Sequence, residues 1–361
     1  MTTNRRTRGH FQGCLLGGAI GDALGWPIEF DPWDSIRRRY GPEGIQELDP
    51  RGHRLAQVTD DTQMTLFTAE GLLVGLAQGL DRDPRELADM VHQAYLRWLS
   101  TQDETSRHPD FAEVQHHGWL GKVAALQVRR APGNTCLAGT RSQVAGSRAH
   151  PLNDSAGCGA LMRMAPVGLI VADPVAAFAL GADCGALTHG SPSGYLPAGF
   201  FAAVIARLVA GEELRPAIDA TIPILKQYEG HKPVLDLLER ALQTVGRPLP
   251  SPEVLHGFGG GWQGHEAMAI SLCCALAAGE DFARGVRLAV NHSGDSDSTG
   301  SITGNLLGLL LGLEAIPQRW RDGVELAAEI GGLATDLLQR HEDSTGWRAR
   351  YGSRQAEESR A

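Results

Sequence analysis

The apolar residues of this 361-residue chain recur at helical spacing along almost its whole length, which restricts the fold more than any other feature. Between residues 62 and 79, for example, Met64, Phe67 and Leu72 lie on one broad face of a helix. Alternating apolar and polar residues are scarce, and no strand–helix–strand rhythm of a parallel sheet is present. The sequence therefore predicts an all-α protein. Helices are expected near 11–25, 62–79, 84–100, 160–171, 174–186, 193–210, 232–246, 264–278, 300–313 and 323–341.

The composition predicts one compact helical domain with polar ends. Apolar residues make up 42% and charged residues 21%, which is ordinary for a globular protein with a large core. No change in composition marks a linker and no internal repeat is visible, so we expect one domain over residues 10–342. A flexible N-terminal arm is expected at 1–9, and residues 343–361 have the composition of a disordered tail. The polar residues 101–150 are expected to form a short helix or two and a surface loop.

Net charge and cysteine content restrict the partners and the cellular compartment expected for this protein. A net charge of −9 argues against a nucleic-acid-binding surface, because phosphate contacts need clustered lysine and arginine. No run of 18 uncharged apolar residues exists, so no membrane span is expected. The six cysteines show neither a Cys-x-x-Cys pair nor regular spacing, and no secretory signal is recognised. These features predict a cytoplasmic protein with free thiols and no zinc site.

Glycine is enriched, at 45 residues, about one in eight against a usual one in fourteen. Gly13, Gly17, Gly21 and Gly25 recur every fourth residue and therefore share one face of the first expected helix. Because glycine inside a helix costs about 1 kcal/mol relative to alanine, this face needs a packing reason. We expect another helix to lie close against it, and a ligand close to the backbone is the alternative.

Two acidic clusters indicate the chemistry most directly. They are Thr59-Asp60-Asp61-Thr62 and Asp295-Ser296-Asp297-Ser298-Thr299, and each joins two carboxylates to hydroxyl groups at the start of an apolar helical run. Carboxylate and hydroxyl oxygens are the ligands that Mg²⁺ and Mn²⁺ prefer and that softer metals avoid. If the fold brings the clusters together, they form a two-metal hydrolytic site. For the first cluster alone, capping of a helix N-terminus is an equally good explanation.

The second cluster also matches parts of two other motifs. A calcium-binding EF-hand loop agrees at its first, third and sixth positions, but its twelfth position holds Leu306 in place of a bidentate glutamate. Haloacid-dehalogenase phosphatases also use Asp-x-Asp-x-Thr, after a hydrophobic strand near the start of an α/β domain. Here the motif follows Asn291-His292-Ser293-Gly294 in the last fifth of a helical chain. The calcium loop is excluded, and the phosphatase stays a minor alternative.

Five segments, taken in order, carry a resemblance to a known family: Gly17–Gly25, Thr59–Thr62, Gly159–Pro166, Leu187–His189 and Gly294–Gly300. Together they resemble the ADP-ribosylglycohydrolase family, which includes the dinitrogenase-reductase-activating glycohydrolases and the ADP-ribosylarginine hydrolases. Any one segment is weak, but five in order, with matching helical context, are specific. The resemblance implies a single all-α domain with a binuclear Mg²⁺ or Mn²⁺ centre in a central cleft.

The resemblance also implies roles for individual residues near the metals. Six positions match the family's metal ligands: Thr59, Asp60, Asp61, Asp295, Asp297 and Ser298. Asp60 or Asp61 would take a proton from a metal-bound water, and the sequence does not choose between them. Glu29 matches an acidic residue that lies near the metals on a mobile loop and gates the substrate.

Seven further positions match substrate contacts of the family: Asn153, Ser155, Gly157, Cys158, Gly159, His189 and Trp262. The first five belong to a loop of small residues before a helix, where exposed N–H groups can receive a diphosphate. Relatives often have asparagine in place of Cys158, which puts a side-chain hydrogen bond from that position in doubt. His189 matches a residue near the distal ribose and phosphate, and Trp262 belongs to a glycine–tryptophan loop. A flexible turn, a structural histidine and a core tryptophan are the alternatives.

The implied function is removal of ADP-ribose from a modified acceptor, by attack of a metal-activated water at the anomeric carbon. Ser298 stands where many members have threonine and favours ADP-ribosyl-arginine on protein. The partner would be an ADP-ribosylated protein or an ADP-ribose-containing small molecule, and the enzyme a monomer or small homo-oligomer. Two alternatives remain. One is a non-catalytic ADP-ribose-binding or crystallin-like relative, which loss of metal ligands would favour. The other is an immunity protein against an ADP-ribosylating toxin, which insertions within 101–150 would favour.

Overall fold

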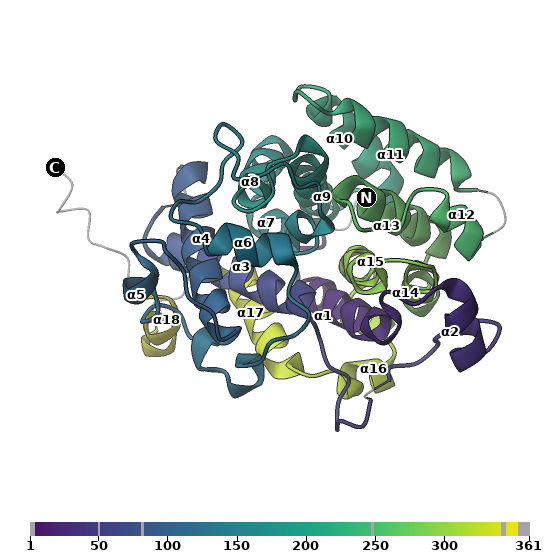
Figure 1. The fold of residues 1–361 in the computed structure, drawn as a ribbon, viewed down its shortest axis with the longest axis horizontal. Coiled ribbons are helices and arrows are strands. Elements are labelled where there is room, and N and C mark those ends of the chain that lie inside the picture. Colours follow the sequence, from purple (N-terminus) through teal and green to yellow (C-terminus); the bar gives the residue numbers. More distant parts are fainter. Residues whose placement is uncertain (1–3, 50, 81–82, 247–248, 341–343, 353–361) are drawn as a thin grey trace.

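A close contact between two helices far apart in the sequence organises the fold. In the computed structural model, which describes residues 4–49, 51–80, 83–246, 249–340 and 344–352, α1 (Arg8–Gly25) packs along α15 (Ser296–Leu311) in the middle of the molecule (Figure 1). A methyl group on any glycine of the α1 face would overlap a main-chain oxygen of α15. This confirms the predicted close contact between helices. The facing pairs are Gly13 with Gly308, Gly17 with Gly304, Gly21 with Gly300 and Gly25 with Ser296.

The predicted all-α class is confirmed. The described residues form helices and turns only, apart from two isolated bridges, Ala56 with Val324 and Gly157 with Gln263. The other helices are α2 (Trp33–Tyr40), α3 (Asp60–Ala77), α4 (Pro84–Thr101), α5 (Phe111–Val114), α6 (Asn134–Thr140), α7 (Ala165–Ile170), α8 (Pro174–Ala186), α9 (Pro192–Val209), α10 (Leu214–Leu225), α11 (Lys232–Thr244), α12 (Pro252–His256), α13 (Gly264–Ala278), α14 (Phe282–Val290), α16 (Gln318–Gly323), α17 (Ala327–Gln339) and α18 (Thr345–Tyr351). Short 3₁₀ turns are η1 (Trp26–Ile28), η2 (Leu120–Lys122), η3 (Ala124–Leu126), η4 (Cys158–Ala160) and η5 (Leu313–Ala315).

Most expected helices lie within a few residues of their predicted bounds, with one correction. The helix predicted over 160–171 is interrupted: η4 and a turn precede α7, whose Pro166 stands in the first turn, where proline starts a helix more readily than it continues one. Six helices were not predicted, namely α2, α10, α12, α14, α16 and α18. They are 5 to 12 residues long, too short for an apolar period to stand out.

Both chain ends are more ordered than expected where the structure describes them. In the predicted arm, α1 already begins at Arg8, and the buried Arg5 donates from its main-chain N–H to Val209 O (3.0 Å) and from Nη1 to Glu212 O (2.8 Å). In the predicted disordered tail, residues 345–351 form α18, whose Trp347 and Tyr351 bury their rings. Residues 1–3, 343 and 353–361 of these two expectations lie outside the described residues.

Helix α9 is long and apolar enough by length and composition to cross a membrane. However, 78% of it is buried inside the protein, where it packs against α7, α8, α10 and α13. A core helix of a globular protein has the same composition, so α9 is weak evidence for a membrane span.

Candidate active site

Both acidic clusters open onto one cavity of about 330 Å³, here called the acidic cavity. Asp60 and Asp61 form the first turn of α3, whereas Asp297 and Ser298 belong to the first turn of α15. A larger cavity of about 490 Å³ lies beside α2 and α14, but its lining is largely proline, leucine and arginine. The acidic cavity therefore brings together residues of both predicted clusters. Its acidic and hydroxyl lining is Glu29, Asp60, Asp61, Thr135, Asp295, Asp297 and Ser298.

The first cluster caps a helix, which confirms the capping interpretation, and its two carboxyl groups also line the acidic cavity. The Thr59 hydroxyl accepts a hydrogen bond from the Asp61 N–H (3.3 Å) and caps α3. Thr59 does not line the acidic cavity, because its hydroxyl donates to Asp22 Oδ1 on α1 (3.0 Å). The Asp22 carboxylate also accepts from the Thr62 hydroxyl (2.5 Å) and from the main-chain N–H groups of Thr59 and Thr62. Asp22 thus fixes the start of α3 relative to α1.

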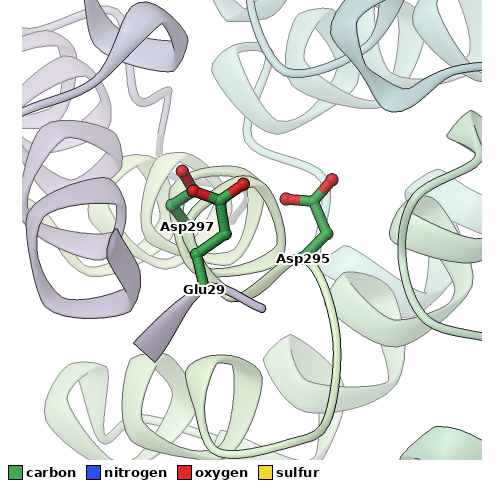
Figure 2. Close-up of side chains that lie close together, drawn as sticks. All are labelled: Glu29, Asp295 and Asp297. Carbon is green, nitrogen blue, oxygen red and sulfur yellow. The ribbon is translucent and has the colours of Figure 1, made fainter. Parts of the chain in front are cut away.

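The second cluster is held by the start of α15. Asp295 is the N-cap, and its Oδ1 accepts from the Ser298 N–H (3.3 Å). Its Oδ2 accepts from the thiol of Cys158 (2.8 Å), and Asp297 Oδ1 accepts from the Ser298 N–H (2.9 Å). Figure 2 shows the carboxyl groups of Asp295, Asp297 and Glu29 gathered around one space. One oxygen of each lies within 4.8 Å of the others, which is close enough to share a cation.

The carboxyl groups at the acidic cavity have raised pKa values and lack a basic partner in the described residues, which favours binding of a cation. Burial, followed by the Asp297 carboxylate, raises the pKa of Glu29 to about 10 and that of Asp22 to about 7. Burial also raises the pKa of Asp60 to about 8 and raises the pKa values of Asp61, Asp295 and Asp297. Among the ion pairs of the described residues, none joins a basic side chain to these six carboxyl groups.

The donor set fits a hard divalent cation. The buried Asp61 Oδ1 has no hydrogen-bond partner, which is costly for a carboxylate oxygen unless a cation or water completes it. All the oxygen donors are carboxylate or hydroxyl, as Mg²⁺ and Mn²⁺ prefer. The residues present therefore suit the metals implied by the family resemblance.

The predicted substrate contacts divide into two groups. Gly157, Cys158, Gly159, His189 and Trp262 line the acidic cavity.

Asn153 and Ser155 do not line it and instead shape the loop. Asn153 donates to Thr188 O (2.8 Å) and accepts from the main-chain N–H of Ser155 (3.0 Å) and of Gly190 (3.2 Å). Ser155 Oγ accepts from the Gly157 N–H (3.3 Å). Their side chains hold the loop in place without facing the cavity.

Several residues at the cavity were not predicted. Phe30, which is 70% exposed, stacks on Trp262, which is 40% exposed, with ring centroids 4.9 Å apart. The φ of Phe30 is +69°, which is rare for a bulky residue. Residues with such a backbone conformation occur most often at functional sites. Residues 131–136 form another part of the wall, and the Gly133 N–H donates to Asp60 Oδ2 (3.0 Å). The Pro132-Gly133-Asn134 turn is the one sequence signal that could have drawn attention to this wall.

Comparison with known proteins agrees with the fold. The chain belongs to the ADP-ribosylglycohydrolase family, whose model matches residues 1–346. Family membership supports a hydrolase that acts on ADP-ribose linkages.

An uncharacterized protein of Archaeoglobus fulgidus is 28% identical, over 92% of this chain and 96% of the relative. The ADP-ribosylarginine hydrolase Tri1 of Serratia proteamaculans is 24% identical, over 91% of this chain and 78% of the relative. A solved structure described as an ADP-ribosylglycohydrolase-related protein complex matches with a TM-score of 0.61 at 26% identity, covering 93% of this chain and 99% of that chain.

Proposed function

We propose that the protein removes ADP-ribose from arginine side chains of modified proteins, with two bound Mg²⁺ or Mn²⁺ ions. The observation that carries this proposal is the convergence of two remote acidic clusters and Glu29 on one cavity, with no ion pair to a basic side chain in the described part of the chain. The ionised form of such a cluster is unfavourable unless cations bind to it, which is why burial raises the pKa values of its carboxyl groups when none is bound. Family membership supplies the class of linkage.

The metal-binding residues would be Asp60, Asp61, Asp295, Asp297 and Ser298, with Thr59 from the edge of the site. The Thr59 hydroxyl hydrogen is directed to Asp22, so the oxygen keeps a lone pair for a cation. Bound divalent ions would hold the ribose hydroxyls and lower the pKa of a water molecule.

The side chains of the protein supply the remaining steps. Asp60 Oδ2 is engaged by the Gly133 N–H, whereas Asp61 Oδ1 is unpartnered, so we propose Asp61 as the group that takes the proton of the attacking water. Glu29 follows η1 and faces Asp297, in a position to close the cavity over the ribose. In the 157–159 loop, the Gly157 N–H donates to Ser155 Oγ (3.3 Å) and the Cys158 N–H to Trp262 O (3.0 Å), so the Gly159 N–H would be the main-chain group that binds the diphosphate.

Two features favour an arginine acceptor. The negative charge of the acidic cavity attracts the guanidinium of an ADP-ribosylated arginine. A serine linkage is neutral and has no comparable electrostatic attraction. At its mouth, the exposed Phe30–Trp262 pair offers aromatic faces to a cation. The Serratia relative is an ADP-ribosylarginine hydrolase by name, which agrees with this assignment.

The alternatives gain less support. Oxygen donors are retained at all six predicted metal positions, which does not favour a non-catalytic relative. An immunity role would need an insertion within 101–150 that contacts a toxin. Residues 131–136 of this stretch instead form a wall of the cavity, where the Gly133 N–H donates to Asp60.

A direct test offers the purified protein four substrates with Mg²⁺ or Mn²⁺ present: ADP-ribosyl-arginine, ADP-ribosyl-serine, ADP-ribosylated nucleic acid and O-acetyl-ADP-ribose. We expect released ADP-ribose, measured by chromatography, to appear at least about tenfold faster from the arginine linkage. EDTA should abolish turnover, and added Mg²⁺ should restore it. Turnover that EDTA leaves unchanged would overturn the metal dependence, and faster release from serine would overturn the acceptor.

Asp22→Asn tests the support beneath the cavity. The amide presents only one oxygen where the carboxylate accepts several hydrogen bonds from Thr59 and Thr62, so the start of α3 should shift. We expect the affinity for Mn²⁺, measured by calorimetry, to fall about 10- to 100-fold, as is typical of residues that orient metal ligands. The half-exposed Asp219 of α10 provides the matched control, because Asp219→Asn lies on the surface. Unchanged Mn²⁺ affinity in Asp22→Asn would contradict the assignment.

A further inference from the structure

Beneath the acidic cavity, a buried arginine is connected to His189 through one hydroxyl group. Arg163 lies in the turn before α7 and is 0% exposed, and its Nη2 donates to Thr188 Oγ1 (2.7 Å). The same oxygen lies 2.8 Å from His189 Nδ1. The Nη1 group of Arg163 reaches only the sulfur atoms of Met64 and Cys136 (both 3.4 Å), which are weak acceptors. Among the described residues, Thr188 is thus the one oxygen acceptor of this guanidinium.

The direction of the second hydrogen bond follows from what each group can donate. A guanidinium has no acceptor, so Thr188 Oγ1 must accept from Arg163. Thr188 is 1% exposed, and among the described residues its hydroxyl has no partner other than Arg163 and His189. If His189 Nδ1 carried a hydrogen and donated it, the hydroxyl hydrogen would be buried without an acceptor. The hydroxyl therefore donates to Nδ1, and a neutral ring must carry its hydrogen on Nε2.

The environment also keeps the ring neutral. Burial, followed by the nearby Arg163 charge, lowers the pKa of His189 to about 3. An imidazolium would need an acceptor at each nitrogen, and Nδ1 faces a hydroxyl whose hydrogen is already directed at it.

The Nε2 atom faces the loop predicted to receive the diphosphate. A methyl group added at Gly157 or Gly159 would lie 3.1 Å or 3.3 Å from this nitrogen. Both glycines and His189 line the acidic cavity. We propose that Arg163 and Thr188 are positioning residues that fix His189 as the Nε2–H tautomer, so that its ring donates a hydrogen bond to a phosphate or ribose oxygen of the substrate. The donor role rests on the proposed function, whereas the tautomer does not.

The tautomer can be read in the unaltered protein. In the full chain labelled with ¹⁵N-histidine, the two ring nitrogens of His189 are assigned by the resonances that disappear in His189→Gln. At neutral pH we expect a protonated Nε2 and an unprotonated Nδ1 that accepts a hydrogen bond. A hydrogen on Nδ1, or averaging between the two tautomers, would overturn the proposal without dependence on any variant's stability.

A matched pair of variants tests the consequence for binding. Thr188→Ser keeps the hydroxyl, and Thr188→Val replaces it with a methyl group of similar size. With Mg²⁺ present, calorimetry with ADP-ribose should give affinities within about twofold for the wild type and Thr188→Ser, and an affinity about tenfold lower for Thr188→Val. In the ¹⁵N spectrum, Thr188→Val should show mixed tautomers, which a merely structural role for Thr188 would not produce.

The outcomes separate this proposal from the proposed function. Equal affinity of all three proteins for ADP-ribose would overturn the positioning role. A wild type with the Nε2–H tautomer that binds ADP-ribose but does not cleave ADP-ribosyl-arginine would overturn the acceptor assignment and still support the positioning role.

Discussion

Asp297→Asn should lower turnover of ADP-ribosyl-arginine by about 1,000-fold or more, beyond the 10- to 100-fold typical of residues that only support a metal site. The reason is its central place in the acidic cavity. The charge of Asp297 is among the causes that raise the pKa values of Asp22, Glu29, Asp61 and Asp295. No other described carboxylate could replace both its charge and its place in the first turn of α15. Initial rates at saturating Mg²⁺ measure the effect.

The same substitution should leave the fold intact and, without metal, stabilise it. Removing one of several mutually repelling buried carboxylates lowers the electrostatic cost of the folded state. We therefore expect a higher midpoint of thermal unfolding than the wild type in EDTA, and a smaller upward shift on adding Mg²⁺. Asp219→Asn should change neither quantity. Full activity of Asp297→Asn and of the parallel variant Asp60→Asn would refute the assignment of the site.

Gly21→Ala should destabilise the protein by about 3 kcal/mol, at the upper end of the cost of overpacking a core. An added methyl group would overlap the carbonyl of Gly300, and because the obstacle is backbone, α1 and α15 would have to separate. Urea denaturation followed by circular dichroism measures the loss. Because α1 carries Asp22 and α15 carries Asp297, the remaining folded protein should also bind Mn²⁺ less tightly.

Gly332→Ala is the matched control for this prediction. Gly332 lies inside α17, and a methyl group there would meet nothing within 4 Å. Alanine should therefore stabilise the helix by about 0.5–1 kcal/mol. Equal stability changes in the two variants would show that the α1–α15 contact is not as tight as the structure indicates.

The fold class and the close helix contact could be predicted because both depend on local spacing. Apolar residues at helical spacing identify helices such as α3 without knowledge of their neighbours. The recurrence of glycine at every fourth residue of α1 likewise predicts a helix face against which another main chain packs closely. The acidic clusters stand out because carboxylate and hydroxyl oxygens are the ligands that Mg²⁺ and Mn²⁺ prefer, although helix capping explains the first cluster equally well.

The remaining features depend on distances between segments that the sequence does not relate. The Asp22 carboxylate supports Thr59 and Thr62 only because α1 and α3 meet, and Phe30 reaches Trp262 across more than two hundred residues. The motif placed the loop at the cavity, but it could not show that Asn153 and Ser155 hydrogen-bond within the loop and do not line the cavity.

Which residue types are present, and which helical face they occupy, follows from the order of amino acids, because helix geometry is local. Whether six carboxyl groups repel one another strongly enough to require cations is a different matter. That repulsion depends on separation through space and on burial, and here the packing of α1, α3 and α15 sets both.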